Sequence, residues 1–396
     1  MDWCLLRGRD HLEAPTGDVD ILVAPAHVAE LDDVVRAHGF VRLRCWLNGT
    51  QRAYVGPAVG SVPWVALHVV TELSFGTMHA MPLPSGVAAG VLGRSIVDRG
   101  VPVAASTDEL WITLLHCWFD KGRIAEKHRQ RLPELVDTDA VVLPAEVRSL
   151  LPPRVLGLVG ERRWEEVEAF GADTARRQLR RPRVRARWAL NAASLSAHKL
   201  AELFGAPAPS VALIAPDGAG KSTVSAALGD ALWFGVHVEY LGLYGSAMKQ
   251  PAASRFGLGF PQRLLRLWAR GLRGHWRRMR GNLVVYDRHP IEPSLEPPRS
   301  WRRAGARALL RRALPRPSLV IVLDAPGAVL HERSGEHTPE VLERARLRYR
   351  HAFEGQPGVV FVDAARSIDD VLAEVRAHIW GLYVARDRRG STGNES

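Results

Sequence analysis

The stretch that decides the fold of this chain of 396 residues runs from Ser210 to Leu228 and reads SVALIAPDGAGKSTVSAAL. An apolar run over residues 211–214 predicts a buried strand, a turn of small residues follows, and the segment after Gly220 is compatible with a helix. Strand, glycine-rich turn and helix in this order, with Gly-Lys-Ser-Thr closing the turn, are typical of a phosphate-binding loop. In such a loop the backbone N–H groups of the turn and of the helix N-terminus converge on phosphate oxygens.

The side chains of this loop have distinct expected roles. Lys221 places its charge on the terminal phosphates of a nucleotide, and the Ser222 hydroxyl holds magnesium. Ala215 stands where the usual pattern has glycine, which costs little if its φ is negative and more if it is positive. The predicted nucleotide-binding residues are Ala215, Pro216, Asp217, Gly218, Ala219, Gly220, Lys221, Ser222 and Thr223.

The composition is that of a globular protein, with 46% hydrophobic and 24% charged residues. The length suffices for two domains, each with its own core. The sequence has no apolar run long enough to span a bilayer, and its first residues lack the order of a secretory signal. The three cysteines are far apart and odd in number, which indicates neither a disulfide framework nor a zinc site. A reducing cytoplasm is the expected location.

The net charge of +11 comes from a basic set in which only five of 53 residues are lysine. Such a skew is more typical of a genome-wide arginine bias than of a nucleic-acid surface. Arginines are dense over residues 176–187 and 263–280, and neither stretch has the glycine and aromatic pattern of an RNA-binding sheet. We expect solvated helix faces, or phosphate steering toward the nucleotide site, rather than nucleic-acid binding.

The first 105 residues indicate a mixed α/β region. The segment GDVDILV, residues 17–23, alternates acidic and apolar residues and then becomes wholly apolar, as a strand entering a core does. Asp18 and Asp20 are two residues apart, so on a strand both carboxylates point to one face. Paired carboxylates of this kind hold magnesium and a triphosphate for nucleotidyl transfer. Asp18 and Asp20 are therefore further metal candidates, with surface or turn carboxylates as the alternative.

Leu6-Arg7-Gly8 followed by residues 18–23 resembles the nucleotidyltransferase-like fold of the polymerase-β superfamily, and most of all its divergent bacterial branch. That resemblance implies a third carboxylate on a later strand, but the candidate strand, residues 62–70, has Ala66 beside His68 there. The resemblance therefore implies a degenerate nucleotidyltransferase-like domain. The chain begins almost inside the first element, which suggests a missing start or a trimmed domain.

A helical region is expected next, over residues 107–135, with Thr107 as its N-cap. His116 and Asp120 are four residues apart, and a hydrogen-bonded pair inside a helical packing domain is expected rather than a metal pair. The same region resembles the substrate-side helices of the nucleotidyltransferase-like proteins. Residues 160–205 are helical in character and rich in arginine, and Pro182 predicts a kink or a division into two helices.

A second strand with a functional signal, residues 282–286, runs directly into Asp287-Arg288-His289. An acid at the carboxyl end of a parallel strand lies in the crevice where open α/β sheets bind ligands. Asp287 is a candidate for holding a magnesium-bound water or the phosphoryl acceptor, and Arg288 for clamping a phosphate. A salt bridge within a turn is the alternative. Strands at 318–326 and 358–362, alternating with helices, predict a parallel sheet with right-handed crossovers.

Over about residues 208–383, five motifs in this order resemble thymidylate kinase: DGAGKST, VVYDRH, LVIVLDAP followed by Arg333, ERARLRY, and VVFVDA. The resemblance implies an ATP- and Mg²⁺-dependent transfer of phosphate, dTMP + ATP to dTDP + ADP. It implies that Asp217 faces the acceptor and that Asp287 and Arg288 position the acceptor phosphate, with His289 in place of a tyrosine. It also implies that Arg333, together with Arg344 or Arg346, closes over the phosphates.

The acceptor side departs from that family. Its members carry an Arg-Glu-Pro-Gly segment after the second strand, whereas residues 238–250 read VEYLGLYGSAMKQ and lack the arginine. Phosphoryl transfer is therefore better supported than thymidylate as the acceptor, and a sugar or polyol phosphate remains open. The alternatives are a nucleotidyltransferase with a regulatory ATP-binding domain and an inactive ATP-binding protein. Of Arg344, Arg346, Arg348 and Arg350, we expect at least two to lie on a solvated helix face.

The expected architecture has a C-terminal P-loop NTPase domain, with three layers around a parallel sheet, and an N-terminal α+β nucleotidyltransferase-like domain with a helical extension. The predicted boundaries are 1–165 for the N-terminal domain, 166–207 for an arginine-rich helical linker, 208–385 for the kinase-like domain and 386–396 for a disordered tail. A small-molecule acceptor and a homodimer are the expected partners.

Overall fold

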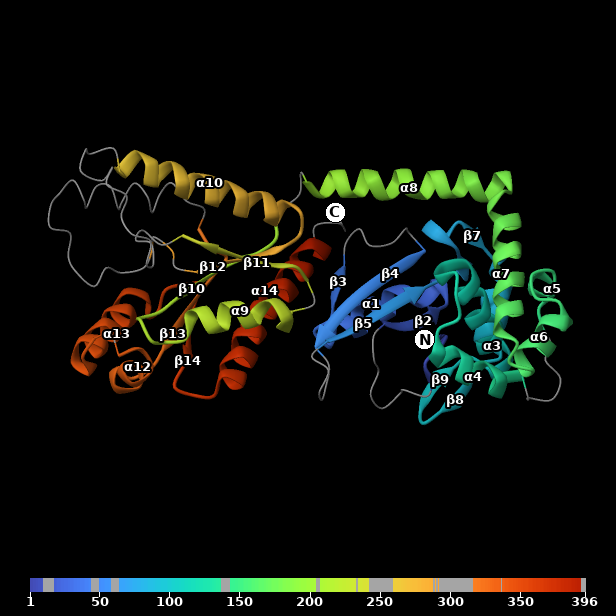
Figure 1. Ribbon diagram of the computed structural model, residues 1–396, viewed down its shortest axis with the longest axis horizontal. Coiled ribbons are helices and arrows are strands. Elements are labelled where there is room, and N and C mark those ends of the chain that lie inside the picture. Colours follow the sequence, from blue (N-terminus) through green and yellow to red (C-terminus); the bar gives the residue numbers. More distant parts are fainter. Residues whose placement is uncertain are drawn as a thin grey trace. The chain divides into compact units, whose positions relative to one another are not determined.

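The computed structural model divides into two compact units, Met1–Leu200 and Ala201–Ser396 (Figure 1). Both units are mixed α/β, as the sequence predicts, and each is described by itself. The structure describes residues 1–9, 18–43, 50–57, 64–136, 143–203, 207–232, 234–241, 259–287, 289, 291, 316–335 and 337–392.

The first unit is built on a seven-stranded mixed sheet of order β3-β4-β5-β2-β1-β9-β8. β2 lies at its centre, parallel to β5 and antiparallel to β1. The short strands β6 and β7 form a separate ribbon. The strands are β1 (Trp3–Leu5), β2 (Asp18–Val23), β3 (Val41–Leu43), β4 (Gln51–Pro57), β5 (Trp64–Val70), β6 (Ser74–Phe75), β7 (Met81–Pro82), β8 (Ile96–Asp98) and β9 (Val101–Val103).

The apolar end of β2 is buried on both faces of the sheet, which explains why its last three residues are all hydrophobic. Ile21 and Val23 pack with Leu31 and Val35 of helix α1 (Val28–Ala37). Leu22, which points to the other face because side chains alternate along a strand, joins a larger core formed with the helices that follow.

Those helices form the helical extension of the first unit. Its helices are α2 (Ser85–Gly93), α3 (Ser106–His116), the π-helical turn η4 (Cys117–Lys121), α4 (Glu126–Val136), α5 (Ala145–Arg148), α6 (Pro153–Gly160), α7 (Trp164–Leu179) and α8 (Pro182–Leu203). Two details differ from the sequence prediction. The N-cap of α3 is Ala105, without a side-chain cap, so the assignment of Thr107 was wrong, and Gly122 in the left-handed conformation ends the helix instead of letting it continue to residue 135.

The arginine-rich region is two helices, as Pro182 predicts. Pro182 is the first residue of α8, where its fixed φ and missing N–H fit. The expected linker over residues 166–207 is not borne out in its extent, because α7 packs onto the first unit through Val167 and Gly171 and that unit reaches Leu200. The apolar residues of α7 recur at helical spacing and pack on this unit, although the segment as a whole is strongly charged.

The second unit has a five-stranded, wholly parallel sheet of order β11-β12-β10-β13-β14. Its strands are β10 (Ser210–Ile214), β11 (Val236–Tyr240), β12 (Leu283–Asp287), β13 (Leu319–Asp324) and β14 (Val359–Asp363). The chain leaves β10 for one edge, returns to β12, and then crosses to β13 on the other side of β10. The order of strands therefore reverses at β10, and the crevice beyond its carboxyl end is where such sheets bind ligands.

Helices cover both faces of this sheet (Figure 1). Leu267 of α10 (Gly259–Met279) and Tyr349 of α13 (Pro339–Phe353) pack on the face that carries Ala212 and Ile214. Helices α9 (Lys221–Ala231) and α14 (Ile368–Thr392) pack against each other and against the sheet from the other side. A short helix, α12 (Gly327–Ser334), connects β13 to α13.

The end of α14 corrects the prediction of a disordered tail from residue 386. The helix continues to Thr392, and Asp387 is buried. Arg386 donates a hydrogen bond to the carbonyl oxygen of Pro207 at 3.1 Å, which ties this last part of the helix to the entry of β10. Among the helices that the structure describes, none combines the length and apolar character needed to cross a bilayer.

Gly171 provides a test of how α7 packs on the first unit. A Cβ atom at this position would lie 2.2 Å from the Cδ1 of the core residue Trp118, so Gly171→Ala must displace the indole ring. We expect this substitution to lower the free energy of unfolding by about 1–3 kcal/mol. Gly157→Ala, in α6 with no atom within 4 Å of the added methyl, is the matched control. That control should stabilise by about 0.5–1 kcal/mol, and urea denaturation of both variants distinguishes the outcomes.

Candidate phosphate-binding site

The loop between β10 and α9 has the backbone that a phosphate cradle requires. Gly218 and Gly220 both have positive φ, +87° and +82°, and Gly220 is the N-cap of α9. Residues with a Cβ adopt these angles only with strain, so glycine is required at both positions. The loop thus reaches the N-terminus of a helix of eleven residues, where free N–H groups and the helix dipole favour an anion.

The close approach of α12 is a second reason why residue 218 must be glycine. A Cβ atom there would lie 2.4 Å from the backbone oxygen of Leu330, closer than any side chain tolerates. The close approach of α12 to the loop therefore depends on the absence of a side chain at this residue.

Ala215 fits its position. The described non-glycine residues with positive φ are Met78, His79, Arg99 and Arg162, so the backbone of Ala215 is ordinary for an alanine. Its side chain is buried, at 1% exposure. The departure from the usual glycine therefore carries no backbone strain.

Lys221 closes over the loop from the first turn of α9. Its ammonium donates hydrogen bonds to the carbonyl oxygens of Ala215, at 2.5 Å, and of Pro216, at 3.1 Å. The residue is only 8% exposed. Ser222 and Thr223, the next two residues, are exposed. The loop thus places a lysine, the N-terminus of a helix and two exposed side chains with hydroxyls within a few residues.

Two acids end the strands on either side of β10. Asp287 closes β12 and lies in register with Leu213, two residues before the loop begins. His289 is buried, and its Nδ1 accepts a hydrogen bond from the N–H of Ile291 at 3.3 Å. Arg288 lies outside the described residues.

The second strand-end acid, Asp324 of β13, was not singled out from the sequence. Its oxygens accept hydrogen bonds from Arg346, at 2.7 and 3.1 Å, and from Arg350, at 3.1 Å. Burial alone would raise the pKa of Asp324, but the two guanidinium groups outweigh it and lower the pKa. The available signal was the spacing of the two arginines by four residues on one helix, which places both on the same face.

The arginines of α12 and α13 fall into three groups according to their contacts. Arg346 and Arg350 are bound to Asp324, whereas Arg344 and Arg348 are exposed on α13, so two of the four lie on a solvated face as expected. Arg333 lies at the end of α12 and donates to the carbonyl oxygen of Ala364, after β14, at 2.7 Å. In this structure the guanidinium of Arg333 therefore binds backbone oxygens directly after β14.

Of the two candidate metal-binding carboxylates on β2, Asp20 is engaged by other side chains and Asp18 is exposed. Asp20 forms an ion pair with Arg7 at 2.5 Å and a hydrogen bond with Nδ1 of His68 at 2.9 Å, while Asp18 is exposed. Burial would raise the pKa of Asp20, but the hydrogen bond from His68 and the charge of Arg7 lower it far below its usual range. His68 lies in register with Asp20, and Ala66 with Asp18. Both oxygens of Asp20 are thus occupied by cationic or N–H partners.

His116 and Asp120 form the hydrogen-bonded pair that their spacing predicts, with Nδ1 2.7 Å from Oδ2. Asp120 also accepts the N–H of Gly76 at 2.6 Å, which anchors the helical region to the loop after β6. Within the part of the chain that the structure describes, no three His, Cys, Asp or Glu side chains gather as a metal site would require.

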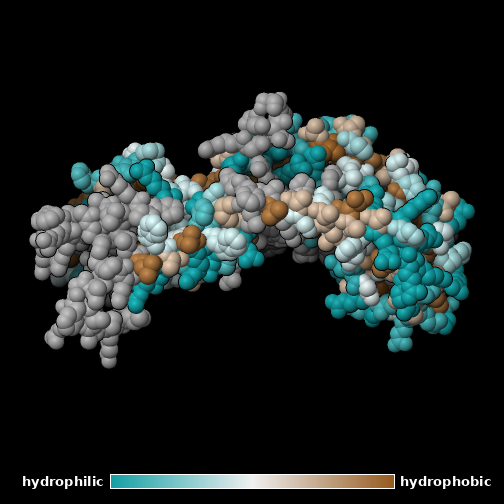
Figure 2. All heavy atoms as spheres, turned by 90° about the horizontal axis from the view of Figure 1, so that it is seen from above, coloured by the Kyte–Doolittle hydropathy of each residue, from teal (hydrophilic) through white to brown (hydrophobic). Residues whose placement is uncertain are grey.

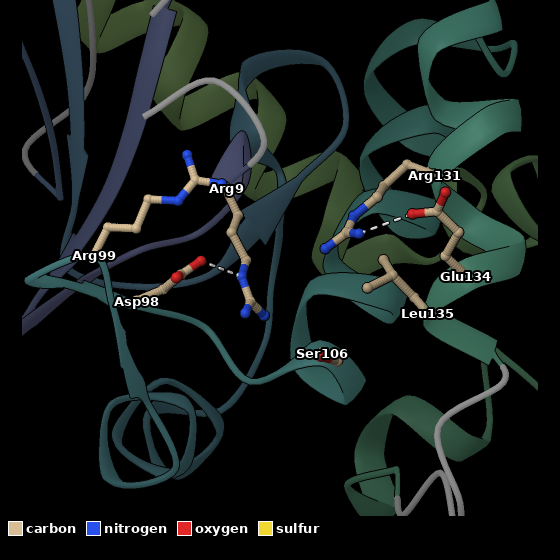
Figure 3. Close-up of a pocket in the computed structure, with 7 residues that line it drawn as sticks. All are labelled: Arg9, Asp98, Arg99, Ser106, Arg131, Glu134 and Leu135. Carbon is tan, nitrogen blue, oxygen red and sulfur yellow. Dashed lines mark hydrogen bonds and ion pairs between the residues drawn. The ribbon is translucent and has the colours of Figure 1, made fainter. Parts of the chain in front are cut away.

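The first unit also contains a pocket of about 350 Å³ (Figure 3). Its lining is Arg9, Asp98, Arg99, Ser106, Arg131, Glu134 and Leu135. Arg9 pairs with Asp98 at 2.5 Å and Arg131 with Glu134 at 2.9 Å, so most of its positive charge is neutralised locally. The sequence did not predict this pocket, because its residues come from four separate segments.

No protein-family model matches the sequence, and no curated protein matches it. Among solved structures, the chain is similar to a deoxyadenosine kinase from M. mycoides with bound dATP, at 13% sequence identity. The match covers 42% of this chain and 97% of that chain, with a TM-score of 0.31. The strand order and the loop geometry therefore carry the assignment of the site.

Asp324 supplies a test of the arginine clamp. Asp324→Asn leaves Arg346 and Arg350 with a weaker acceptor, and we expect the free energy of unfolding to fall by about 2 kcal/mol at neutral pH. The lowered pKa means that this contribution is present above the unfolded-state pKa, about 4, and is lost as pH falls through the folded-state value. The difference between wild type and variant in urea denaturation should therefore shrink on acidification.

The matched control is Asp363→Asn, because Asp363 occupies the register position beside Asp324 on β14 but its side chain is 61% exposed. An equal loss of stability in both variants would contradict the role assigned to the clamp.

Asp20 supplies the corresponding test for the first unit. Asp20→Asn removes the charge that Arg7 and His68 face, and we expect a loss of about 2 kcal/mol in unfolding free energy. Asp18→Asn, on the same face of β2 but exposed, should change it by less than about 0.5 kcal/mol. If Asp20→Asn left stability unchanged and abolished a pyrophosphate-releasing activity, the structural role would be refuted.

Proposed function

We propose that this protein transfers a phosphoryl group from ATP, with Mg²⁺, to a nucleoside monophosphate such as dTMP or to a related phosphorylated or hydroxyl acceptor. The observation that carries the proposal is the loop after β10, where two positive-φ glycines and a nearly buried lysine meet the N-terminus of α9. The thymidylate-kinase-like part is assigned to residues 208–385.

The part of the site that would bind ATP, the phosphoryl donor, is better supported than the part that would bind the acceptor. Lys221 donates hydrogen bonds to two loop carbonyls, and the charged oxygens of a nucleotide are stronger acceptors than these neutral groups. The β- and γ-phosphates of ATP would therefore compete for this ammonium while the N–H groups of the turn bind the remaining oxygens. Phosphoryl transfer asks a protein mainly for such positioning and charge neutralisation.

The donor set also fits magnesium. Mg²⁺ prefers oxygen ligands and is usually held by one or two protein groups together with phosphates and water. The exposed hydroxyl of Ser222 and the carboxylate of Asp287 are oxygen donors at the loop and at the end of the adjacent strand. Bound there, the ion would neutralise charge on the transferred phosphoryl group. Asp324 is not proposed as a ligand because two arginines occupy its oxygens.

The acceptor half is assigned to Asp217, Asp287, Arg288 and Arg333. Asp287 lies on the side of the loop toward β11, and the segment after β11 is described only to Leu241. For Arg333 to contact phosphates it must release the carbonyl oxygen of Ala364. A movement of the Arg333 side chain, driven by the charge of the bound nucleotide, would supply that change.

Lys221→Ala tests the proposal. We expect wild type to bind ATP·Mg²⁺ and to transfer phosphate to at least one member of a panel of nucleoside monophosphates and sugar phosphates. The variant should lose about 100-fold or more in kcat/KM, because it lacks the charge that stabilises the transferred group. Calorimetric ATP titration and a coupled assay for ADP measure the two steps separately.

Lys127→Ala, at an exposed lysine of the first unit, is the control and should behave as wild type. If wild type and Lys221→Ala fail equally to bind ATP and to turn over every acceptor, the proposal is wrong. Tight ATP binding by wild type without transfer to any acceptor would instead identify an inactive ATP-binding protein.

A further inference from the structure

Helix α10 has an apolar face that the described residues of the second unit do not cover. Leu265, Trp268, Leu272 and Trp276 are spaced by three and four residues, so they form one stripe along the helix. Their exposed fractions are 71, 57, 71 and 57%. Figure 2, which views the molecule from the side where α10 lies, shows hydrophobic residues at the surface along it. A continuous apolar stripe on the solvent-exposed side of a helix is typical of an interaction site.

The opposite side of α10 is the one that packs. Leu267, Gly271, Gly274 and Arg278 are buried, and at 100° per residue they lie on the side of the helix opposite Leu265. A Cβ atom on Gly274 would lie 3.2 Å from the hydroxyl of Tyr286, so the small residue lets α10 lie close to β12. The orientation of α10 is therefore set by its contact with the sheet, and the apolar stripe points away from it.

The charges of α10 are all positive. The helix contains six arginines and neither aspartate nor glutamate. Three of the arginines bind their own unit, because Arg270 donates to the carbonyl oxygen of Tyr240, Arg277 to Glu239 and Arg278 to the carbonyl oxygen of Ala208.

The arginines that border the stripe face solvent. Arg266 and Arg273 of α10, and Arg280 directly after its last residue, are exposed and recur every seven residues, so they follow one edge of the apolar face. An apolar stripe with a basic edge complements a surface that is apolar within and anionic at its boundary.

We propose that α10 docks this protein on the surface of an anionic phospholipid bilayer. The helix lies in the plane of the membrane, with its leucines and tryptophans at the boundary between headgroups and acyl chains. Tryptophan suits that depth because its ring is apolar while its indole N–H is polar. The arginines of the edge extend toward lipid phosphates.

The charge pattern favours a membrane over a second copy of the chain. Two α10 helices packed antiparallel through their stripes would bring two basic edges together without an acid on either helix, and like charges repel. Lipid phosphates instead supply the counter-charge along the whole helix.

The test is co-flotation of the full chain with vesicles. Vesicles of phosphatidylcholine alone are compared with a mixture of about three parts phosphatidylcholine to one part phosphatidylglycerol. We expect binding to the mixed vesicles that is at least about tenfold stronger than to the neutral ones and that weakens as salt is added. Equal binding to both vesicles, or none to either, would overturn the proposal.

Leu272→Glu should reduce binding to the mixed vesicles by about tenfold or more, whereas Leu347→Glu, an exposed leucine on α13 of the same unit, should leave it unchanged. Because residue 272 is 71% exposed, both variants should fold alike, which circular dichroism on heating verifies. Arg266→Gln combined with Arg273→Gln should weaken binding to mixed vesicles only. A chain that is dimeric in solution, becomes monomeric with Leu272→Glu and ignores vesicles would instead assign the face to an interface between copies.

Discussion

The site in the second unit depends on one backbone constraint, the close approach of α12 to Gly218. The backbone oxygen of Leu330 occupies the space that any side chain on residue 218 would need. α12 is in turn held against α13, because a Cβ on Gly327 would lie 2.4 Å from the oxygen of Pro339, and the N–H of Gly327 donates to Glu343. The absence of side chains at Gly218 and Gly327 thus allows the loop, α12 and α13 to approach one another in direct backbone contact.

The arginines of α13 complete this arrangement at the sheet. Arg346 bridges Glu343 and Asp324, so the same helix that grips the start of α12 also binds the end of β13. Since β13 is a direct neighbour of β10, the loop is supported both through the sheet and through α12. A loop held from two directions changes shape little when a ligand binds, so less of the binding free energy is spent on ordering it.

Sequence patterns predicted the parts of this fold that depend on local chemistry. The strands of the second unit, the loop from Ala215 to Thr223 and the division of the arginine-rich region at Pro182 follow from hydrophobic runs and from the φ preferences of glycine and proline. The clamp on Asp324 was missed because its partners lie 22 and 26 residues away, and sequence alone does not show which of several arginines turns inward. The tail was misassigned for a similar reason, since its charged residues conceal contacts such as that of Arg386 with Pro207.

Each unit contains a charged side chain that is held by hydrogen bonds, but the partners of the two side chains differ. In the first, Asp20 lies on a strand, but a cation and an imidazole bind both its oxygens, so the carboxylate stabilises the sheet. In the second, Lys221 donates hydrogen bonds to the carbonyl oxygens of Ala215 and Pro216 in its own loop, and a phosphate is a stronger acceptor than these neutral groups. A neutral carbonyl is displaced from a cation more easily than a carboxylate is displaced from an ion pair. This difference in partners, more than the residue types themselves, separates the structural carboxylate from the lysine to which we assign a role in catalysis.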